Sequence, residues 1–286
     1  MSRIKNYSPL RYPGGKRKLT AYIEQLISEN QLKNITYIEP YAGGAAVALN
    51  LLINGHVKKI ILNDLDKSIY AFWYCVINHT DELCELIRNV DITLDEWNKQ
   101  KAVQANKINE PLLTLGFSTI FLNRTNRSGI IKAGVIGGLN QDGNYKLDCR
   151  FNKDALIEKI QLISKYKNKI KLYNLDAIEF ISSVVTKLNT TNFILLDPPY
   201  YKKGASLYNN FYSHEDHVAL HKKLASLKRH YWILTYDNVP EIAKIYSKFR
   251  TATYSINYTA QTKYSGSELL IYDRKILIPQ NTNNLP

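Results

Sequence analysis

One short stretch, residues 193–200, decides the fold, and it reads FILLDPPY. Its four leading apolar residues are typical of a strand that is buried on both faces of a parallel sheet. A polar tetrapeptide follows at the carboxyl end of that strand, where open α/β sheets bind their ligands. The stretch therefore predicts a parallel sheet with a binding site at residues 197–200. A tight Pro-Pro turn that merely ends the strand is the alternative.

Strand and helix patterns alternate on both sides of this stretch. Such alternation is typical of a Rossmann-like α/β sheet with helices on both faces. Two late segments, residues 253–258 and 268–272, are separated by a polar loop with a glycine and suit an antiparallel hairpin. The expected strands are residues 36–39, 59–62, 170–173, 193–196 and 231–235, and the expected helices include residues 20–27, 45–53 and 67–78.

The alternation lapses after residue 80. Residues 81–155 contain polar helical stretches and an Arg- and Gly-rich loop at residues 123–143. The strand and helix pattern then returns. We therefore expect a Rossmann-like core, residues 1–80 and 156–286, that is interrupted by a mostly helical inserted domain, residues 81–155.

The charge balance indicates the kind of partner. Lys and Arg number 38 against 25 Asp and Glu, which gives a formal net charge of +13. A basic face gains affinity for nucleic acid by releasing counterions from phosphates, although a merely basic protein is the alternative. The three cysteines lack C-x-x-C spacing, which disfavours a zinc site or a disulfide framework. With neither a signal-peptide pattern nor an apolar run of membrane-spanning length, we expect a cytoplasmic protein with no membrane partner.

Residues 197–200 have the groups that would activate an exocyclic purine amine. Such an amine is a poor nucleophile, because its lone pair is delocalised into the ring. The Asp197 carboxylate and the Pro198 carbonyl are two acceptors that would bind the amine hydrogens and localise that pair. Pro198 and Pro199 make the loop rigid, and Tyr200 offers a ring on which an extruded base would stack. We therefore expect Asp197, Pro198, Pro199 and Tyr200 to be the catalytic residues.

A second candidate binding element is residues 38–45, which read IEPYAGGA. The expected strand ends at Glu39, and the small residues around Gly43 let backbone amides approach a ligand. Asp64 lies about 20 residues further on, at the end of the next strand, where a carboxylate binds ribose hydroxyls in dinucleotide sites. A plain glycine turn and a strand-ending Asn-Asp turn are the alternatives.

The N-terminal segment RYPGGK, residues 11–16, looks like a phosphate loop. It fails the pattern of the P-loop, because Arg17 stands where Ser or Thr is required and the glycine spacing is wrong. An ATPase is therefore disfavoured.

Taken in order along the chain, these motifs resemble those of the DNA adenine methyltransferases of the Dam type, and the resemblance covers nearly the whole chain. It implies a Rossmann-like enzyme that transfers methyl from S-adenosylmethionine to N6 of a flipped adenine in double-stranded DNA. The motifs read YPGGK at residues 12–16, EPYAGG at 39–44, ND at 63–64, FLNR at 121–124 and DPPY at 197–200.

The resemblance also implies the cofactor site. Asp176 lies at a further strand end and would approach the adenine of the cofactor, although an N-cap for a helix at residues 177–185 is the alternative. Gly43 belongs to the loop whose amides would approach the same ligand. The residues expected to bind the cofactor are Tyr12, Lys16, Glu39, Gly43, Asp64, Asp176 and Asp197.

The same resemblance implies that residues 81–155 are the target-recognition domain. Arg can bind guanine or phosphate, and Asn can pair with an adenine edge. A solvated basic loop is the alternative, and because the sequence departs from better-known members after Arg124, it assigns no recognition sequence. The expected DNA-binding residues are Arg124, Asn126, Arg127 and Lys132.

Other functions remain open at this level. A methyltransferase for RNA adenine, one for a protein amide, which usually has Asn at position 197, and a catalytically silent DNA-binding regulator are the rivals. We expect His214, His217 and His221 on a helix surface, because no further ligands complete a zinc site and methyl transfer from a sulfonium needs no metal. A monomer would suffice, since one active site modifies one strand per visit. The biological role, whether restriction, phage defence or genome marking, is not encoded in these motifs.

Overall fold

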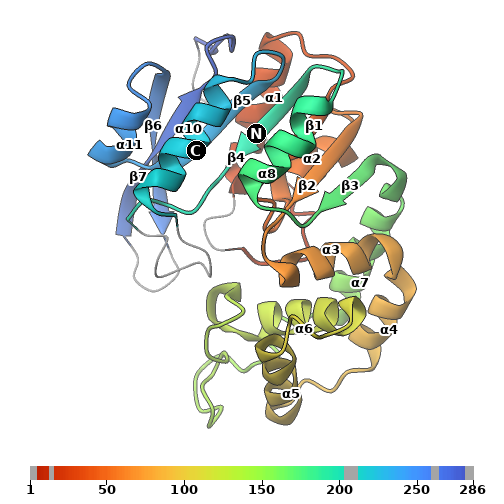
Figure 1. Ribbon diagram of the computed structural model, residues 1–286. Coiled ribbons are helices and arrows are strands. Elements are labelled where there is room, and N and C mark those ends of the chain that lie inside the picture. Colours follow the sequence, from red (N-terminus) through yellow and green to blue (C-terminus); the bar gives the residue numbers. More distant parts are fainter. Residues whose placement is uncertain (1–4, 13–15, 203–211, 259–263, 281–286) are drawn as a thin grey trace.

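The strand predicted from the FILL run is the central strand of a seven-stranded sheet in the computed structural model (Figure 1). The structure describes residues 5–12, 16–202, 212–258 and 264–280. The strand order is β3-β2-β1-β4-β5-β7-β6, in which β1 to β5 pair in parallel and β7 is antiparallel to both of its neighbours. The Rossmann-like α/β core predicted from the alternating pattern is therefore confirmed.

The secondary structure follows the predicted alternation closely. The strands are β1 (Thr36–Glu39), β2 (Lys59–Asn63), β3 (Ile170–Tyr173), β4 (Asn192–Leu196), β5 (Tyr231–Asp237), β6 (Arg250–Tyr258) and β7 (Tyr264–Tyr272). The α-helices are α1 (Thr20–Glu29), α2 (Ala46–Ile53), α3 (Lys67–Asn78), α4 (Thr80–Asn89), α5 (Leu94–Ala105), α6 (Leu112–Thr125), α7 (Lys153–Ser164), α8 (Ala177–Ser183), α10 (His214–Ala225) and α11 (Pro240–Ile245). Short 3-10 turns are η1 (Lys16–Leu19), η2 (Arg127–Gly129), η3 (Lys167–Lys169) and η4 (Val185–Lys187).

Each central strand is buried on both faces, which explains its continuous apolar run. Phe193 and Leu195 of β4 belong to a core shared with α1, α2 and α3. Ile194 and Leu196 point to the opposite face and join a core shared with α8, α10 and α11. Because side chains alternate between the faces of a strand, all four positions of the run must be apolar.

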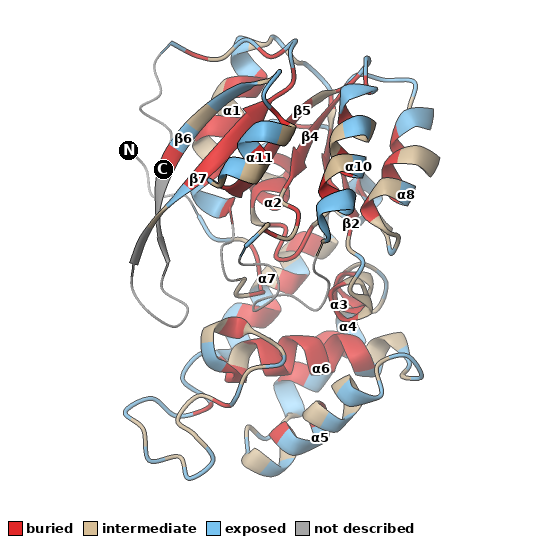
Figure 2. Ribbon diagram, turned by 60° about the vertical axis from the view of Figure 1, so that its left-hand side comes forward, coloured by how far each residue is buried: buried red, intermediate tan, exposed pale blue. Residues whose placement is uncertain are grey.

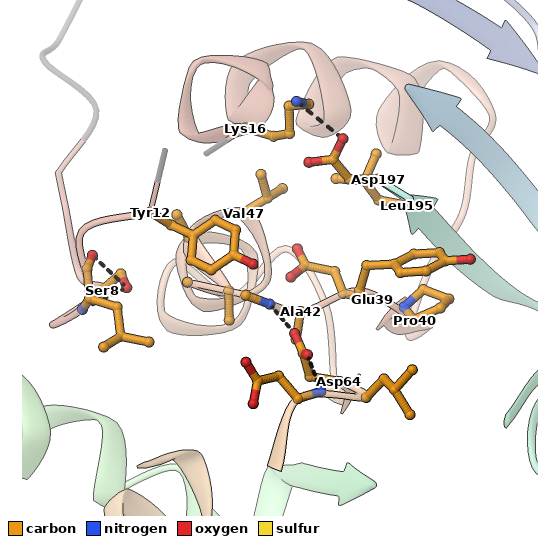
Figure 3. A pocket seen from close by; sticks show the side chains of 18 of the residues that line it. Ser8, Tyr12, Lys16, Glu39, Pro40, Ala42, Val47, Asp64, Leu195 and Asp197 are labelled. Atoms are coloured by element: carbon orange, nitrogen blue, oxygen red, sulfur yellow. Dashed lines mark hydrogen bonds and ion pairs between the residues drawn. The ribbon is translucent and has the colours of Figure 1, made fainter. Parts of the chain in front are cut away.

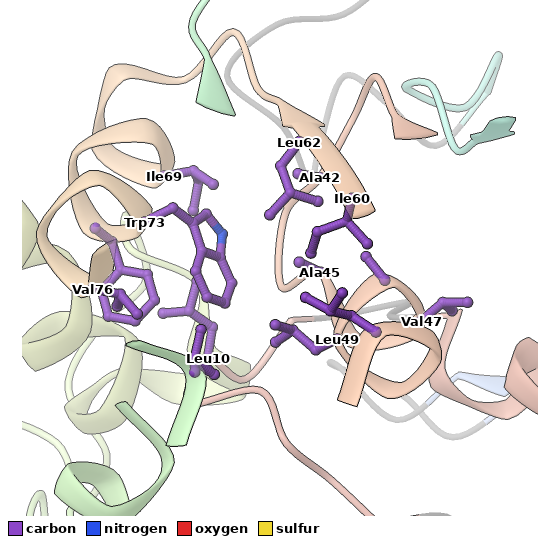
Figure 4. Close-up of a cluster of buried hydrophobic side chains, with 14 of the residues drawn as sticks. Leu10, Ala42, Ala45, Val47, Leu49, Ile60, Leu62, Ile69, Trp73 and Val76 are labelled. Atoms are coloured by element: carbon purple, nitrogen blue, oxygen red, sulfur yellow. The ribbon is translucent and has the colours of Figure 1, made fainter. Parts of the chain in front are cut away.

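The helix α3 connects the sheet to the helical layer that lies beyond its edge (Figures 1 and 2). In Figure 4, Ile69, Trp73 and Val76 of α3 face Leu62 of β2 and Leu49 of α2 across one apolar cluster. Burial of these large side chains stabilises the junction by about 1.5–3 kcal/mol for each one.

The helical layer consists of α4, α5, α6 and the chain up to α7, as predicted from the polar helical pattern after residue 80. Helix α6 packs closely on α3 at Gly116. A Cβ at this position would lie only 2.7 Å from Cys75 Sγ and 2.8 Å from the carbonyl oxygen of Ala71. The predicted loop at residues 123–143 begins too early, since α6 continues to Thr125. The division of the chain at residues 81 and 155 into two domains stays a prediction.

The parallel arrangement sets the position of the site. The carboxyl ends of β1, β2 and β4 meet at one edge of the sheet, close to the helical layer (Figure 1).

Among the described residues, no helix combines the length and the apolar character that a membrane span requires.

Candidate active site

A cavity of about 390 Å³ lies at this edge of the sheet. Glu39 ends β1, Asp64 follows β2 and Asp197 follows β4, so carboxylates from three strands line one space. Figure 3 shows Glu39 lying between the other two along the cavity wall. The cavity is lined by all of the residues assigned above to the cofactor, namely Tyr12, Lys16, Glu39, Gly43, Asp64, Asp176 and Asp197.

The loop between β1 and α2 has a backbone that only certain residues allow. Gly43 has a φ of +45° and Ala45 a φ of +47°. The Gly43 N–H donates to Asp64 Oδ2 at 2.8 Å, and its carbonyl accepts from Trp73 Nε1 at 2.9 Å. A Cβ at Gly43 would lie 2.7 Å from the ring of Tyr12. The close approach of the ring therefore requires glycine at position 43, and the left-handed backbone favours it.

Two of the cavity carboxylates have raised pKa values. Burial raises the pKa of Glu39 to about 8 and the pKa of Asp64 to about 7. Glu39 Oε1 accepts from the N–H of Ala48 at 3.1 Å, and Asp64 Oδ1 accepts from the N–H of Asp66 at 2.9 Å. The strand-ending turn considered for Asp64 is thus present, and the carboxylate lines the cavity as well. A cationic ligand would favour the ionised form of both groups.

Asp176 also combines two positions that the sequence left as alternatives. It is the N-cap of α8, where its Oδ1 accepts from the N–H groups of Ile178 and Glu179 at 2.8 and 3.2 Å. It lines the cavity at an aromatic end formed with Tyr41 and Tyr212, whose hydroxyls share a hydrogen bond of 2.7 Å. An apolar face with one carboxylate at its rim suits a flat heteroaromatic ring that carries donors.

Asp197 also lines the cavity, and its carboxylate is held through one oxygen. Asp197 Oδ1 accepts from the Thr235 hydroxyl at 2.6 Å and lies 3.1 Å from Lys16 Nζ. No hydrogen bond joins Oδ2 to any of the described residues. Burial raises the pKa of Asp197, while the Lys16 ammonium opposes this increase. The carboxylate therefore has one restrained oxygen and one oxygen left to accept a ligand hydrogen.

Lys16 continues this network away from the cavity. Its Nζ donates to Tyr200 Oη at 2.7 Å and lies 3.4 Å from Glu268 Oε2. The hydroxyls of Tyr200 and Tyr254 both donate to the Glu268 carboxylate. Burial alone lowers the pKa of Lys16, but the carboxylates of Asp197 and Glu268 more than offset this, so the pKa is raised. Sequence reasoning missed Glu268, although a single acid within the apolar run ELLIY was a usable signal.

The DPPY loop is fixed beyond its tyrosine as well. Asp237, at the end of β5, accepts from the N–H groups of Tyr201 and Lys202 at 2.9 and 3.0 Å. Tyr200 itself is 6% exposed, and Lys16 Nζ lies 5.1 Å from the centroid of its ring. Its stacking on a base stays a prediction. Pro13, Gly14 and Gly15 of the N-terminal motif lie outside the described residues.

One predicted DNA-binding residue is wrong. Asn126 is fully buried, and its Oδ1 accepts from Trp97 Nε1 at 2.6 Å. Its Nδ2 donates to the carbonyls of Ile130 and Ile131 at 3.1 and 2.8 Å. The amide is therefore used inside the protein, where it shapes the turn after α6, and is not available to a base edge.

The other three residues of that set differ in position. Arg127 and Lys132 are exposed on the turn that Asn126 shapes. Arg124, on the last turn of α6, lines the cavity and donates to the carbonyl of Pro9. Burial, with Arg11 and Arg150 close by, lowers the pKa of Arg124 to about 10.

A basic rim borders the cavity next to Arg124, and the sequence analysis did not identify it. Arg11, Arg17 and Lys159 line the cavity together with Arg124. Burial lowers the pKa of Lys159, and the charges of Arg124 and Arg17 lower it further. In the part of the chain that the structure describes, no carboxylate forms an ion pair with any of these four residues. The rim therefore favours an anion.

The histidine prediction is partly wrong. His214 is exposed, as expected, but His217 is fully buried and shares a 2.7 Å hydrogen bond with Tyr236 Oη. Burial lowers the pKa of His217 to about 4. The rings of Tyr201, Tyr212 and Tyr236 surround His217, which the sequence of α10 does not reveal. No group of three metal-ligating side chains occurs within the described ranges.

Comparisons with known proteins agree with the geometry. A family described as D12 class N6 adenine-specific DNA methyltransferase matches residues 12–262. The chain is 30% identical to the type II methyltransferase M.MjaIII of Methanocaldococcus jannaschii over 210 residues, which cover 67% of this chain and 68% of that protein. It is 27% identical to the modification methylase StsI of Streptococcus sanguinis, over 73% of this chain and 33% of that protein.

Two solved structures also align with this chain over most of its length. One is a putative RNA methyltransferase from Pyrococcus horikoshii, with 12% identity, a TM-score of 0.44 and coverage of 96% of this chain and 94% of the other. The second is an rRNA methyltransferase from Streptomyces viridochromogenes, with 12% identity, a TM-score of 0.40 and coverage of 93% and 88%.

Proposed function

Because the chain belongs to the D12 class N6 adenine-specific DNA methyltransferases, we propose that Asp197 and the Pro198 carbonyl hold the target amine during methyl transfer. The enzyme methylates adenine in DNA, and S-adenosylmethionine is its methyl donor. One observation carries the proposal. The Oδ1 atom of Asp197 is taken by Lys16 and Thr235, so that Oδ2 remains as an acceptor on a residue that lines the cavity.

The cavity residues fit S-adenosylmethionine. The aromatic end at Tyr41 and Tyr212, with Asp176 at its rim, would take the adenine ring. Asp64 would bind the ribose hydroxyls, and Glu39 would attract the positive charges of the cofactor. When bound, the cofactor supplies a methyl group activated by a sulfonium. Tyr12 and Gly43 would form the wall between these groups, and Lys16 the end next to Asp197.

The role of the DPPY loop follows from the chemistry of the amine. Two acceptors on its hydrogens localise the nitrogen lone pair and point it in one direction. Because Lys16 and Asp237 hold the loop at both ends, the acceptors would be in place before the substrate arrives. Positioning of this kind contributes several kcal/mol to the rate of a transfer between two bound groups. Pro199 would keep the loop rigid, and Tyr200 would flank the base.

We propose that the substrate is double-stranded DNA and that the target adenine leaves the duplex to reach this loop. Flipping costs a few kcal/mol, and base-modifying enzymes meet this cost through contacts with the flipped base and the backbone. Two sets of residues would contact the phosphates or bases. One is Arg127 and Lys132, which are exposed on the turn after α6, and the other is the basic rim of Arg11, Arg17, Arg124 and Lys159. The layer formed by residues 81–155 would act as the target-recognition domain.

Further expectations concern the metal requirement, the oligomeric state, the location and the biological role. We propose that the enzyme acts without a metal, as a monomer and in the cytoplasm. Because two relatives are named a type II methyltransferase and a modification methylase, we also propose that the enzyme protects DNA within a restriction-modification system.

The direct test offers labelled S-adenosylmethionine to the purified protein with unmethylated duplex DNA, the same strands unpaired, or total RNA, followed by nucleoside analysis. We expect label in N6-methyladenine of the duplex, and sequencing would then map the site. Label in RNA alone would refute the proposed substrate. Equal transfer to the unpaired strands would refute the requirement for a duplex.

A further inference from the structure

We propose that Glu268 is a positioning residue for the methyl-transfer reaction, which fixes Lys16 and Tyr200 behind Asp197. This inference rests on the role proposed above for Asp197. The residue is fully buried on β7, and it is not among the described residues that line the cavity. It therefore acts on the reaction through other side chains and touches neither cofactor nor base.

The contacts of Glu268 explain how it would do so. One of its oxygens accepts from the Tyr200 hydroxyl and the other from the Tyr254 hydroxyl. Lys16 Nζ lies 3.5 Å from the first oxygen and 3.4 Å from the second. Lys16 is thereby anchored on its far side, and its near side reaches Asp197 Oδ1 at 3.1 Å. Movement of Glu268 would shift both Lys16 and the carboxylate that it restrains.

The position requires an acid rather than an amide. A carboxylate only accepts hydrogen bonds, and here both of its oxygens face hydroxyl donors and a lysine ammonium. Glutamine would place an NH₂ donor against that ammonium at one of the two positions. The free-energy cost of burying the Glu268 carboxylate is offset in part, because the Lys16 ammonium supplies the opposite charge.

The sheet register gives the same residue a second geometric role. Glu268 pairs with Asp237 across β5 and β7, and with Tyr254 across β6 and β7. Asp237 binds the backbone of the two residues after the DPPY motif, while Glu268 binds the side chain of Tyr200, the last residue of the motif. The antiparallel strand β7 thus completes a clamp on the loop, which a sheet that ended at β5 would lack.

Glu268 also affects the charge of the groups that it fixes. Its negative charge adds to burial in raising the pKa of Asp197, and it contributes to the raised pKa of Lys16. The groups that face one another here are Lys16 from η1, Asp197 and Tyr200 after β4, and Tyr254 from β6. Loss of the charge at position 268 would lower the pKa of both Asp197 and Lys16, and so move the active pH range downward.

The test compares three variants of the full-length enzyme: Glu268→Gln, Tyr254→Phe and, as a matched control, Tyr22→Phe. The control also removes one buried hydroxyl, which pairs with Tyr272 at 2.8 Å and not with Glu268. The readouts are kcat, KM for S-adenosylmethionine and for duplex DNA, and the pH profile of kcat.

For Glu268→Gln we expect kcat to fall by about 10- to 100-fold, because misplacement of reacting groups by about 1 Å costs up to 10²-fold. The KM for the cofactor should stay within about twofold, and both limbs of the pH profile should move to lower pH. Tyr254→Phe, which keeps the charge, should lower kcat by less, without moving the limbs. The control should keep wild-type kinetics.

Unchanged kcat in Glu268→Gln would overturn the inference. So would a decrease of kcat that matches the decrease in the fraction of folded protein, with both limbs of the pH profile of kcat in their wild-type positions. If Glu268→Gln does not fold, Tyr254→Phe decides, because wild-type kcat in that variant would contradict the anchoring of Glu268. Asp197→Ala separates the two proposals. Turnover in that variant refutes the role of Asp197 itself, whereas an inactive Asp197→Ala beside a wild-type Glu268→Gln refutes only the role of Glu268.

Discussion

Lys16 Nζ lies 3.1 Å from Asp197 Oδ1, and this ion pair joins the segment before α1 to the carboxyl end of β4. Lys16 is 8% exposed, so its charge is largely removed from water. The pair connects the cavity that we assign to the cofactor with the loop that we assign to the target base. One contact between segments far apart in the sequence thus orients the cofactor cavity relative to the loop for the target base.

Removal of this cation should be costly. Lys16→Met leaves the buried carboxylate of Glu268 and the partly buried carboxylate of Asp197 without this cation, and breaking a buried pair costs about 3–5 kcal/mol. We expect the free energy of unfolding at pH 8 to fall by about that amount. The acid limb of kcat should move to higher pH, because loss of the cation raises the pKa of Asp197. Urea unfolding and a pH–rate profile measure the two effects.

The control for this variant is Lys107→Met. Lys107 pairs with Asp66 at 2.8 Å in a partly exposed position, where ion pairs contribute about 0–1 kcal/mol. Equal losses of stability in the two variants would contradict the account of the buried pair.

Glu39 should make the cofactor-free protein less stable at alkaline pH. Its pKa of about 8 in the folded state exceeds the ordinary 4.5, so the folded protein keeps a proton that the unfolded chain releases. Stability from this group is complete below pH 4.5 and is lost as the pH rises to 8. Glu39→Gln should therefore be more stable than wild type at pH 8, by at least about 1 kcal/mol. Urea unfolding at pH 5 and pH 8 tests this, and an equal slope with pH in both proteins would refute it.

Gly43→Ala should weaken cofactor binding by more than about tenfold. The new Cβ would lie 2.7 Å from the Tyr12 ring, and the φ of +45° is unfavourable for alanine. Calorimetric titration with S-adenosylmethionine measures the effect. Gly55→Ala is the matched control, because Gly55 has a φ of +80° and no atom near its Cβ position. The control should lose stability alone, and weakened cofactor binding in both variants would contradict the explanation.

Two residues of the turn after α6 should differ in role, with Asn126 stabilising the fold and Lys132 contacting DNA. Asn126→Ala leaves the Trp97 indole N–H and two carbonyls without their partner, and each buried unpaired group costs about 1–3 kcal/mol. We expect a loss of stability with an unchanged salt dependence of DNA binding. Lys132→Gln should keep its stability and lower the slope of log Kd against log salt by about 1. Unfolding curves and DNA titrations at several salt concentrations test both, and an unchanged slope in Lys132→Gln would contradict a phosphate contact.

The sequence predicted the features that depend on neighbouring residues. The FILL run required a strand buried on both faces, and the turn chemistry at Glu39 and Asp64 located two strand ends on one edge. The resemblance then added Tyr12 and Lys16, which the structure brings to the same cavity.

The features that depend on pairing between distant segments were not predictable in this way. Glu268 acquires its position from the register of β5, β6 and β7, which a single sequence does not reveal. Asn126 looked like a base-reading amide because its partner, Trp97, comes from another helix. His217 looked exposed because its aromatic neighbour Tyr236 belongs to β5.

The most direct test of the central claim is methyl transfer by Asp197→Ala in a single turnover, with the binding of S-adenosylmethionine and duplex DNA measured on the same preparation. The account predicts that N6-methyladenine is not formed, that DNA is still bound and that the cofactor is bound at least weakly. Methylation of N6 at a rate near that of wild type would contradict the role of Asp197 and of the network built around it.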